Sequence, residues 1–126
     1  MIDSIAKITL YVGDQGEAKR FWTEKMGFVV RLEAPMGPGM TWLEVAPREG
    51  EGTAFVLYDK KLMEQQNPGV SVGHPSVILT TRSIREAHSE LKEKGVETGE
   101  LMEMPYGAMF QFYDMDGNPF LLREEK

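Results

Sequence analysis

The sequence contains no cysteine and only 2 histidines among its 126 residues. Without thiols the chain can form no disulfide framework, no cysteine-based zinc or iron–sulfur site and no cysteine nucleophile. Two histidines are also too few for a histidine-rich metal site. Because a chain of this length buries roughly two thirds of its surface on folding, a core can form without disulfides or a structural metal. We therefore expect one folded domain.

Long hydrophobic runs and basic clusters are also missing. The apolar run Ala54–Tyr58 is far shorter than the ~20 residues that span a bilayer. The 14 basic and 20 acidic residues give a net charge of −6 and are mixed evenly along the chain. Nucleic-acid binding depends on clustered lysine and arginine. We therefore expect a cytoplasmic protein with no nucleic-acid partner and no membrane partner.

The first half of the chain has the pattern of one strand, one helix and three strands. Residues 5–12 alternate between apolar and polar side chains, as in a half-buried strand. Asp14 can cap a helix whose apolar residues recur at helical spacing, and Gly27 can end that helix. Turns rich in glycine and proline then separate three predicted strands at residues 28–34, 40–46 and 53–59.

The same order returns after a connection at residues 60–73, for which we predict one helical turn. A strand at 76–80 precedes a helix that Ser83 and Glu86 would open as a capping box and Gly95 would end. Three further strands are predicted at 98–102, 109–113 and 119–123. Two βαβββ units, at about 1–59 and 74–126, therefore predict an α+β fold for residues 1–126.

Three motifs accompany this repeat: Tyr11-Val12-Gly13-Asp14, Phe21-Trp22 with Met26-Gly27-Phe28, and the run from Asp114 to Leu122 that contains Asp116-Gly117-Asn118. With them the chain resembles the vicinal oxygen chelate superfamily of glyoxalase I, bleomycin-resistance proteins and extradiol dioxygenases. In that family each unit curls into a cup, and two units pair around a cleft that holds a divalent metal and a small ligand. The resemblance implies the glyoxalase/bleomycin-resistance fold, with curled mixed sheets, and a homodimer.

The positions at which this family binds its metal hold poor ligands in this chain. The resemblance places them at Lys7, at Val56 or Leu57, at Ser76 and at Leu121. Divalent ions need imidazole or carboxylate donors, typically three or four, and a protonated lysine repels a cation. We therefore expect the scaffold without its metal, and no other cofactor.

Lys7 is the most informative residue, because strand alternation places it in the cup with Thr9 and Tyr11. Its ammonium could bind an anionic ligand or act as a base with a lowered pKa. It could equally form a salt bridge, for which Glu44 and Glu33 are candidates. Both interpretations stay open at this point.

A ligand site lined by apolar and aromatic side chains and oriented by a few polar ones suits this scaffold. Trp42 and Met109 would line it. The residues that would orient the ligand are Lys7, Ser76, Glu44 and Gln111. The predicted ligand-binding residues are Lys7, Thr9, Tyr11, Trp42, Glu44, Ser76, Met109, Gln111 and Leu121.

Two other motifs have simpler interpretations. The run Gly69–Gly73 matches the Gly-x-Ser-x-Gly pattern of hydrolases, but that motif needs a strand before it and a helix after it, and Pro75 with a strand follows here. His88 lies among apolar helix positions, which favours a structural histidine.

These features predict a metal-independent protein that binds and sequesters a small apolar or aromatic molecule. The alternative is a glyoxalase-type lyase, isomerase or dioxygenase that uses a divalent metal at a non-standard site. A third possibility is an interaction module that binds no small ligand. Fold alone does not decide among them, because one scaffold hosts many activities.

Overall fold

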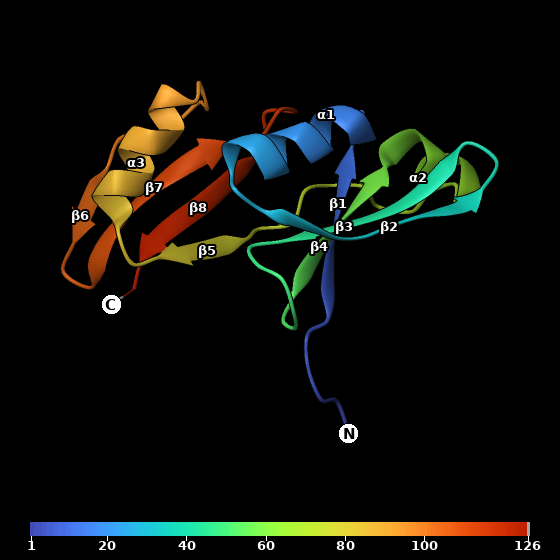
Figure 1. The fold of residues 1–126 in the computed structure, drawn as a ribbon, viewed down its shortest axis with the longest axis horizontal. Coiled ribbons are helices and arrows are strands. Elements are labelled where there is room, and N and C mark those ends of the chain that lie inside the picture. The colour runs from blue at the N-terminus through green and yellow to red at the C-terminus, as the bar shows by residue number, and fades with distance from the viewer. Residues whose placement is uncertain (126) are drawn as a thin grey trace. The chain divides into compact units, whose positions relative to one another are not determined.

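A computed structural model describes residues 1–125 of the chain (Figure 1). The contacts divide the chain into two units, one spanning Met1–His74 and one that begins at Pro75. Each unit contains a four-stranded mixed sheet, and the two sheets have the same strand order. The predicted α+β fold built from two βαβββ units is confirmed.

The first unit contains β1 (Lys7–Val12), α1 (Gln15–Arg20), the π-helical segment η1 (Phe21–Lys25), β2 (Val29–Gly37), β3 (Met40–Ala46), β4 (Ala54–Asp59) and α2 (Lys60–Gln66). The strand order is β1-β4-β3-β2, with β1 parallel to β4 and the other pairs antiparallel. Asp14 caps α1 as predicted, since its Oδ1 accepts a hydrogen bond from the Glu17 N–H at 2.9 Å. α2 has 7 residues, so it is longer than the single turn that we predicted.

α1 and η1 cover one face of the first sheet. The Trp22 ring is fully buried, and its centroid lies 5.1 Å from that of Phe55 on β4 and 4.9 Å from that of Phe28. This face carries the buried apolar residues Leu10, Val12, Leu43, Val45 and Leu57. Because this face forms the core of the unit, polar chemistry is left to the other face of the sheet.

The second unit contains β5 (Ile78–Thr81), α3 (Ile84–Glu93), β6 (Met102–Met104), β7 (Gly107–Tyr113) and β8 (Pro119–Glu124), in the order β5-β8-β7-β6. α3 packs on the face of this sheet that carries Phe110, where the His88 and Phe110 ring centroids lie 4.6 Å apart. The strand that we predicted at 98–102 is misplaced. Only Thr98 forms an isolated bridge, to Phe112, and the regular strand starts at Met102.

The predicted capping box at the start of α3 is wrong. Ser83 makes no side-chain capping hydrogen bond, and its own N–H donates to Thr81 Oγ1 at 3.2 Å. The N–H of Ile84 donates instead to Glu124 Oε2 at 3.3 Å. The carboxylate from the end of β8 therefore serves the helix N-terminus, where negative charge is favourable.

The segment before β1 extends away from the first sheet (Figure 1), and Ile2 and Ile5 are exposed. Its last two residues before β1 are bonded to the unit. Thr53 Oγ1 donates to the Ile5 carbonyl at 2.6 Å, and the Ala54 N–H donates to the Ala6 carbonyl at 3.1 Å. Among residues 1–125, none of the helices has both the length and the apolar character that crossing a membrane would require.

Candidate ligand-binding site

One face of the first sheet carries the polar and aromatic residues that the sequence singles out. In the parallel register of β1 and β4, Thr9 lies opposite Val56 and Tyr11 lies opposite Tyr58. β3 adds Glu44, also opposite Val56. Paired residues share a face, and alternate residues along a strand return to it. We call it the Lys7–Glu44 face and define it by Lys7, Thr9, Tyr11, Trp42, Glu44, Val56 and Tyr58.

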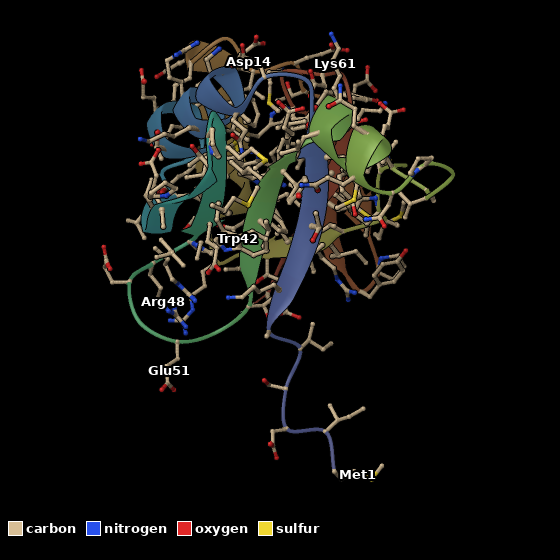
Figure 2. All side chains as sticks on the ribbon, turned by 90° about the vertical axis from the view of Figure 1, so that its right-hand side faces the viewer. Met1, Asp14, Trp42, Arg48, Glu51 and Lys61 are labelled. Carbon is tan, nitrogen blue, oxygen red and sulfur yellow. The ribbon has the colours of Figure 1, made fainter. Side chains whose placement is uncertain are left out.

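All the first-unit residues predicted to bind a ligand lie on this face. Lys7 is exposed, Thr9, Tyr11 and Trp42 are half-buried, and Glu44 is buried. Figure 2 shows Trp42 on the sheet, with Arg48 and Glu51 on the loop that joins β3 to β4. The structure thus brings these residues together, while their role in binding a ligand stays a prediction.

Glu44 is the centre of a hydrogen-bonded network. Its Oε2 atom accepts a hydrogen bond from Lys7 Nζ at 2.7 Å and another from Trp42 Nε1 at 2.7 Å. The Glu44 side chain is only 7% exposed, whereas that of Lys7 is 44% exposed. Of the two predicted salt-bridge partners of Lys7, Glu44 is confirmed. Glu33 pairs instead with Lys19, at 2.8 Å.

The network keeps the Glu44 carboxylate ionised. Burial by itself raises the pKa of Glu44, because a charged group is less stable away from water. The hydrogen bonds from Lys7 and Trp42, together with the positive charges of Lys7 and Arg31, outweigh this effect and hold the pKa of Glu44 below its ordinary value. At neutral pH the face therefore contains a buried carboxylate, an ammonium beside it and an indole that donates to the carboxylate.

Three aromatic rings lie next to this network. The Tyr58 ring has its centroid 6.2 Å from those of both Tyr11 and Trp42, in edge-to-face arrangements. The Tyr58 hydroxyl donates a hydrogen bond to Gln66 Oε1 at the end of α2, and Gln66 Nε2 lies 3.9 Å from Met40 Sδ. The Tyr58 ring is buried, whereas those of Tyr11 and Trp42 are half-buried, so Tyr58 packs against two aromatic rings that stay partly accessible on the face.

Sequence reasoning missed Tyr58 and Gln66. Strand alternation could have found Tyr58, because it lies two residues after Val56 on the same strand. No sequence signal pointed to Gln66, because its contact depends on where α2 packs after leaving β4.

Gln15, at the start of α1, fixes the strands from the end of the sheet. Its Nε2 donates to the Thr41 carbonyl at 2.9 Å and to the Leu57 carbonyl at 2.8 Å. The Gln15 side chain therefore joins β3 to β4 at the residues that precede Trp42 and Tyr58. These two hydrogen bonds help to set the spacing of β3 and β4, and with it the distance between the Trp42 and Tyr58 rings.

The sheet registers show which of the residues that the resemblance placed at metal positions share a face. On β4 this is Val56 rather than Leu57, because Val56 shares a face with Lys7 and Leu57 lies opposite Leu10 on the core face. The second unit repeats the arrangement, since Leu121 lies opposite both Ile78 and Gln111 as Val56 lies opposite Thr9 and Glu44.

These residues do not fit a divalent metal. An ammonium, an isopropyl group, a hydroxyl and an isobutyl group include no imidazole or carboxylate donor. Within residues 1–125, no three or more His, Cys, Asp or Glu side chains gather in a way that could hold a metal ion. Glu44 is a carboxylate on the same face, but its Oε2 atom already accepts hydrogen bonds from Lys7 and Trp42.

The predicted residues of the second unit are brought together only in part. Met109, Gln111 and Leu121 lie on the face of the second sheet that is opposite Phe110 and Phe112. Met109 is buried, Leu121 is half-buried and Gln111 is exposed. Ser76 was expected within the opening strand, but β5 begins at Ile78, so Ser76 lies outside the sheet and is exposed.

Two motifs that we interpreted as structural have structural contacts. His88 has a ring nitrogen 2.9 Å from the Gly99 carbonyl, in addition to its contact with Phe110. The run Gly69–Gly73 lies between α2 and β5 in a segment without regular secondary structure, so it lacks the strand and helix of a nucleophile elbow.

Known proteins resemble this chain along nearly its whole length. The protein YetH of Bacillus subtilis (strain 168), described as uncharacterized, is 42% identical over 125 residues, which cover 98% of this chain and 100% of YetH. Among solved structures, TnmS3, described as an antibiotic binding protein from Streptomyces sp. CB03234, matches with a TM-score of 0.82 and 29% identity, covering 99% of this chain and 98% of TnmS3.

A protein from Sphaerobacter thermophilus DSM 20745, described as a member of the glyoxalase/bleomycin resistance protein/dioxygenase superfamily, also has a TM-score of 0.82. It shares 31% identity, with 98% of each chain covered. Residues 4–122 match the family described as the Glyoxalase/Bleomycin resistance protein/Dioxygenase superfamily. The repeated units, their strand order and this match agree, and the chain belongs to the glyoxalase/bleomycin resistance protein/dioxygenase superfamily.

Proposed function

We propose that this protein binds a small aromatic or apolar molecule without covalent chemistry and without a metal ion, and that sequestration of this molecule is its function. The observation that carries the proposal is the network of Lys7, Trp42 and Glu44, whose lysine occupies a position where the resemblance implies a metal ligand. An ordered set of side chains with no metal donor suits recognition better than Lewis-acid catalysis.

The aromatic surface supports the same proposal. Tyr11, Trp42 and Tyr58 provide rings whose orientations are already fixed, so a planar ligand would lose little free energy in ordering them. TnmS3, which shares the fold and 29% of its residues with this chain, is described as an antibiotic binding protein. We extend that kind of activity to this chain as part of the proposal, together with a homodimeric state and a cytoplasmic location.

Metal content and binding test the proposal together. The protein is purified from cells supplied with nickel, zinc, manganese and iron, and bound metal is measured by elemental analysis. Isothermal titration calorimetry with bleomycin and a panel of aromatic antibiotics is then run with and without EDTA. We expect no stoichiometric metal and at least one antibiotic whose affinity is unchanged by EDTA.

A pair of aromatic deletions tests the location of the site. Trp42→Ala removes a half-buried ring from the Lys7–Glu44 face and should weaken binding at least about tenfold, as for an aromatic residue at the centre of an interface. Tyr106→Ala is the matched control, because it removes an aromatic ring that is 62% exposed in the second unit. Stoichiometric, chelator-removable metal that supports binding or turnover would overturn the proposal in favour of a glyoxalase-type enzyme.

A further inference from the structure

The Lys7–Glu44 face presents its positive charge outward and its negative charge inward. The Lys7 side chain is 44% exposed and that of Glu44 is 7% exposed, although their charged atoms lie 2.7 Å apart. Lys7 is therefore the more accessible member of the ion pair to a molecule that approaches the face. Glu44 is the only acidic residue in the set that defines the face, and its β2 neighbour across the register is Leu32.

A second cation adds to this asymmetry. The Arg31 guanidinium lies near enough to Glu44 to favour its charged form, and it is held in place by the Gly52 carbonyl, which accepts at 2.9 Å and 3.0 Å. The buried carboxylate therefore has Lys7 as its ion-pair partner and a weaker electrostatic interaction with Arg31.

Lys7 also has unused hydrogen-bonding capacity. A lysine ammonium carries three N–H donors. Within residues 1–125 Lys7 donates to one acceptor, Glu44 Oε2. The Lys7 side chain is 44% exposed and the ion pair already orients it, so a ligand oxygen could accept from its remaining donors without the cost of ordering a free lysine. A charge-assisted hydrogen bond of this kind is stronger than one between neutral groups.

Resting on the proposed function, we propose that Lys7 determines which ligands the site accepts: it favours an aromatic molecule that carries a carboxylate or another anionic oxygen over neutral and cationic molecules of the same shape. The half-buried rings of Tyr11 and Trp42, which pack against the buried Tyr58, would contact the aromatic part. The Lys7 ammonium would donate a hydrogen bond to the anionic oxygen.

A matched series of naphthalenes tests the inference by calorimetry. The probes are 2-naphthoate, its methyl ester and 2-naphthylmethylammonium, which share the ring and differ in charge. We expect 2-naphthoate to bind about ten- to a hundredfold more tightly than the cation, with the ester between them. Raising the salt concentration should weaken the binding of 2-naphthoate and leave that of the ester almost unchanged.

Variants then connect the preference to Lys7. Lys7→Met should bring the affinities for 2-naphthoate and its ester to within about threefold, and Lys7→Arg should keep the preference. Because Lys7→Met leaves Glu44 without its cation, the double variant Lys7→Met/Glu44→Gln is measured beside it to separate lost folding from lost recognition. Lys19→Met, which removes the exposed ion pair with Glu33, is the control and should behave like the unaltered protein.

The outcomes separate this inference from the proposed function. Equal affinity for all three probes, or a preference for 2-naphthoate that survives the double variant, would overturn the role of Lys7 while leaving aromatic binding in place. Failure of every probe to bind at about 1 mM, where only about 4 kcal/mol of binding free energy is needed, would overturn both.

Discussion

At the scale of single residues, the chemistry of the candidate site depends on how Glu44 is compensated. A buried carboxylate costs free energy unless hydrogen bonds and opposite charge replace its hydration. Lys7 and Trp42 supply both to one oxygen atom, Oε2. Trp42 therefore serves a second purpose besides its edge-to-face packing, because its indole N–H stabilises the charge that orients the lysine.

The stability contributed by Glu44 should depend on pH. Its pKa in the folded chain is lower than its ordinary value of 4.5, so the contribution is complete above 4.5 and is lost as the pH falls through the lower, folded pKa. We expect Glu44→Gln to reduce the free energy of unfolding by about 1–2 kcal/mol near pH 7, because Lys7 can turn partly to solvent. Urea denaturation at about pH 7 and about pH 3 should show the difference shrinking at the lower value.

The control for this prediction is Glu33→Gln, which removes the ion-pair partner of Lys19. Both Lys19 and Glu33 are well exposed, at 40% and 43%, so the free energy of unfolding should change by less than about 1 kcal/mol at either pH. A cost of Glu44→Gln that stays constant from neutral to acidic pH would contradict the assignment of a lowered pKa.

At the scale of elements, β8 does more than complete the second sheet. It pairs with β5 and β7, and its last residue, Glu124, accepts a hydrogen bond from the N-terminus of α3. The helix is therefore joined to the sheet through a residue 40 positions further along the chain. A local capping box would have bonded the N-terminus of α3 only to residues of the helix itself.

This arrangement predicts that the N-cap residue Ser83 contributes less to stability than the distant Glu124. Ser83→Ala should change the free energy of unfolding by less than about 0.5 kcal/mol, because the hydroxyl does not cap the helix. Glu124→Ala should cost about 0.5–1.5 kcal/mol through the lost hydrogen bond and the lost charge at the helix N-terminus. Thermal unfolding of both variants measures the difference, and a larger loss for Ser83→Ala would show that the sequence pattern was the better guide.

The elements themselves could largely be predicted from the sequence, because alternation and turn residues report directly on local structure. Asp14 and Gly27 mark the helix boundaries in the chain as they do in the structure. The π-helical segment η1 could not be predicted, since buried residues such as Phe21 and Trp22 fall on one side of either kind of helix. Capping by Glu124 also had no local signal.

The candidate site could be predicted only as a set of residues on one face. The salt bridge between Lys7 and Glu44 joins residues 37 positions apart, so choosing Glu44 over Glu33 required the strand register. That Trp42 donates to the same oxygen depends on side-chain rotamers, which periodicity does not describe. Ser76 was placed in a strand because its neighbours alternate, but the pairing with β8 begins only at Ile78.

At the scale of the whole molecule, the repeated units have diverged in chemistry while keeping their topology. Glu44 and Gln111 occupy equivalent places in the two sheets, as do Val56 and Leu121. Within residues 1–125, only the first unit combines a lysine with a carboxylate at this level of the sheet. The duplicated scaffold therefore offers two similar faces of which one carries a charged network.

Divalent metals should accordingly leave the stability of the protein unchanged. A ligand at 100 times its dissociation constant adds about 2.7 kcal/mol to the free energy of unfolding, which raises the melting temperature by several degrees. We expect nickel, zinc and manganese to shift the melting temperature by less than about 1 °C relative to EDTA, whereas a bound aromatic ligand should raise it. A metal-induced rise of several degrees would indicate a cation site built from other residues.

The two tryptophans make these experiments possible without labels. Trp22 lies in the apolar core among aromatic rings, whereas the Trp42 indole is half-buried and donates to a charged carboxylate. An indole's emission responds to nearby charge and to water, so the two fluorophores report on different events. Quenching of Trp42 would follow occupancy of the face, and loss of the Trp22 signal would follow unfolding, so that one emission spectrum separates ligand capture from the integrity of the fold.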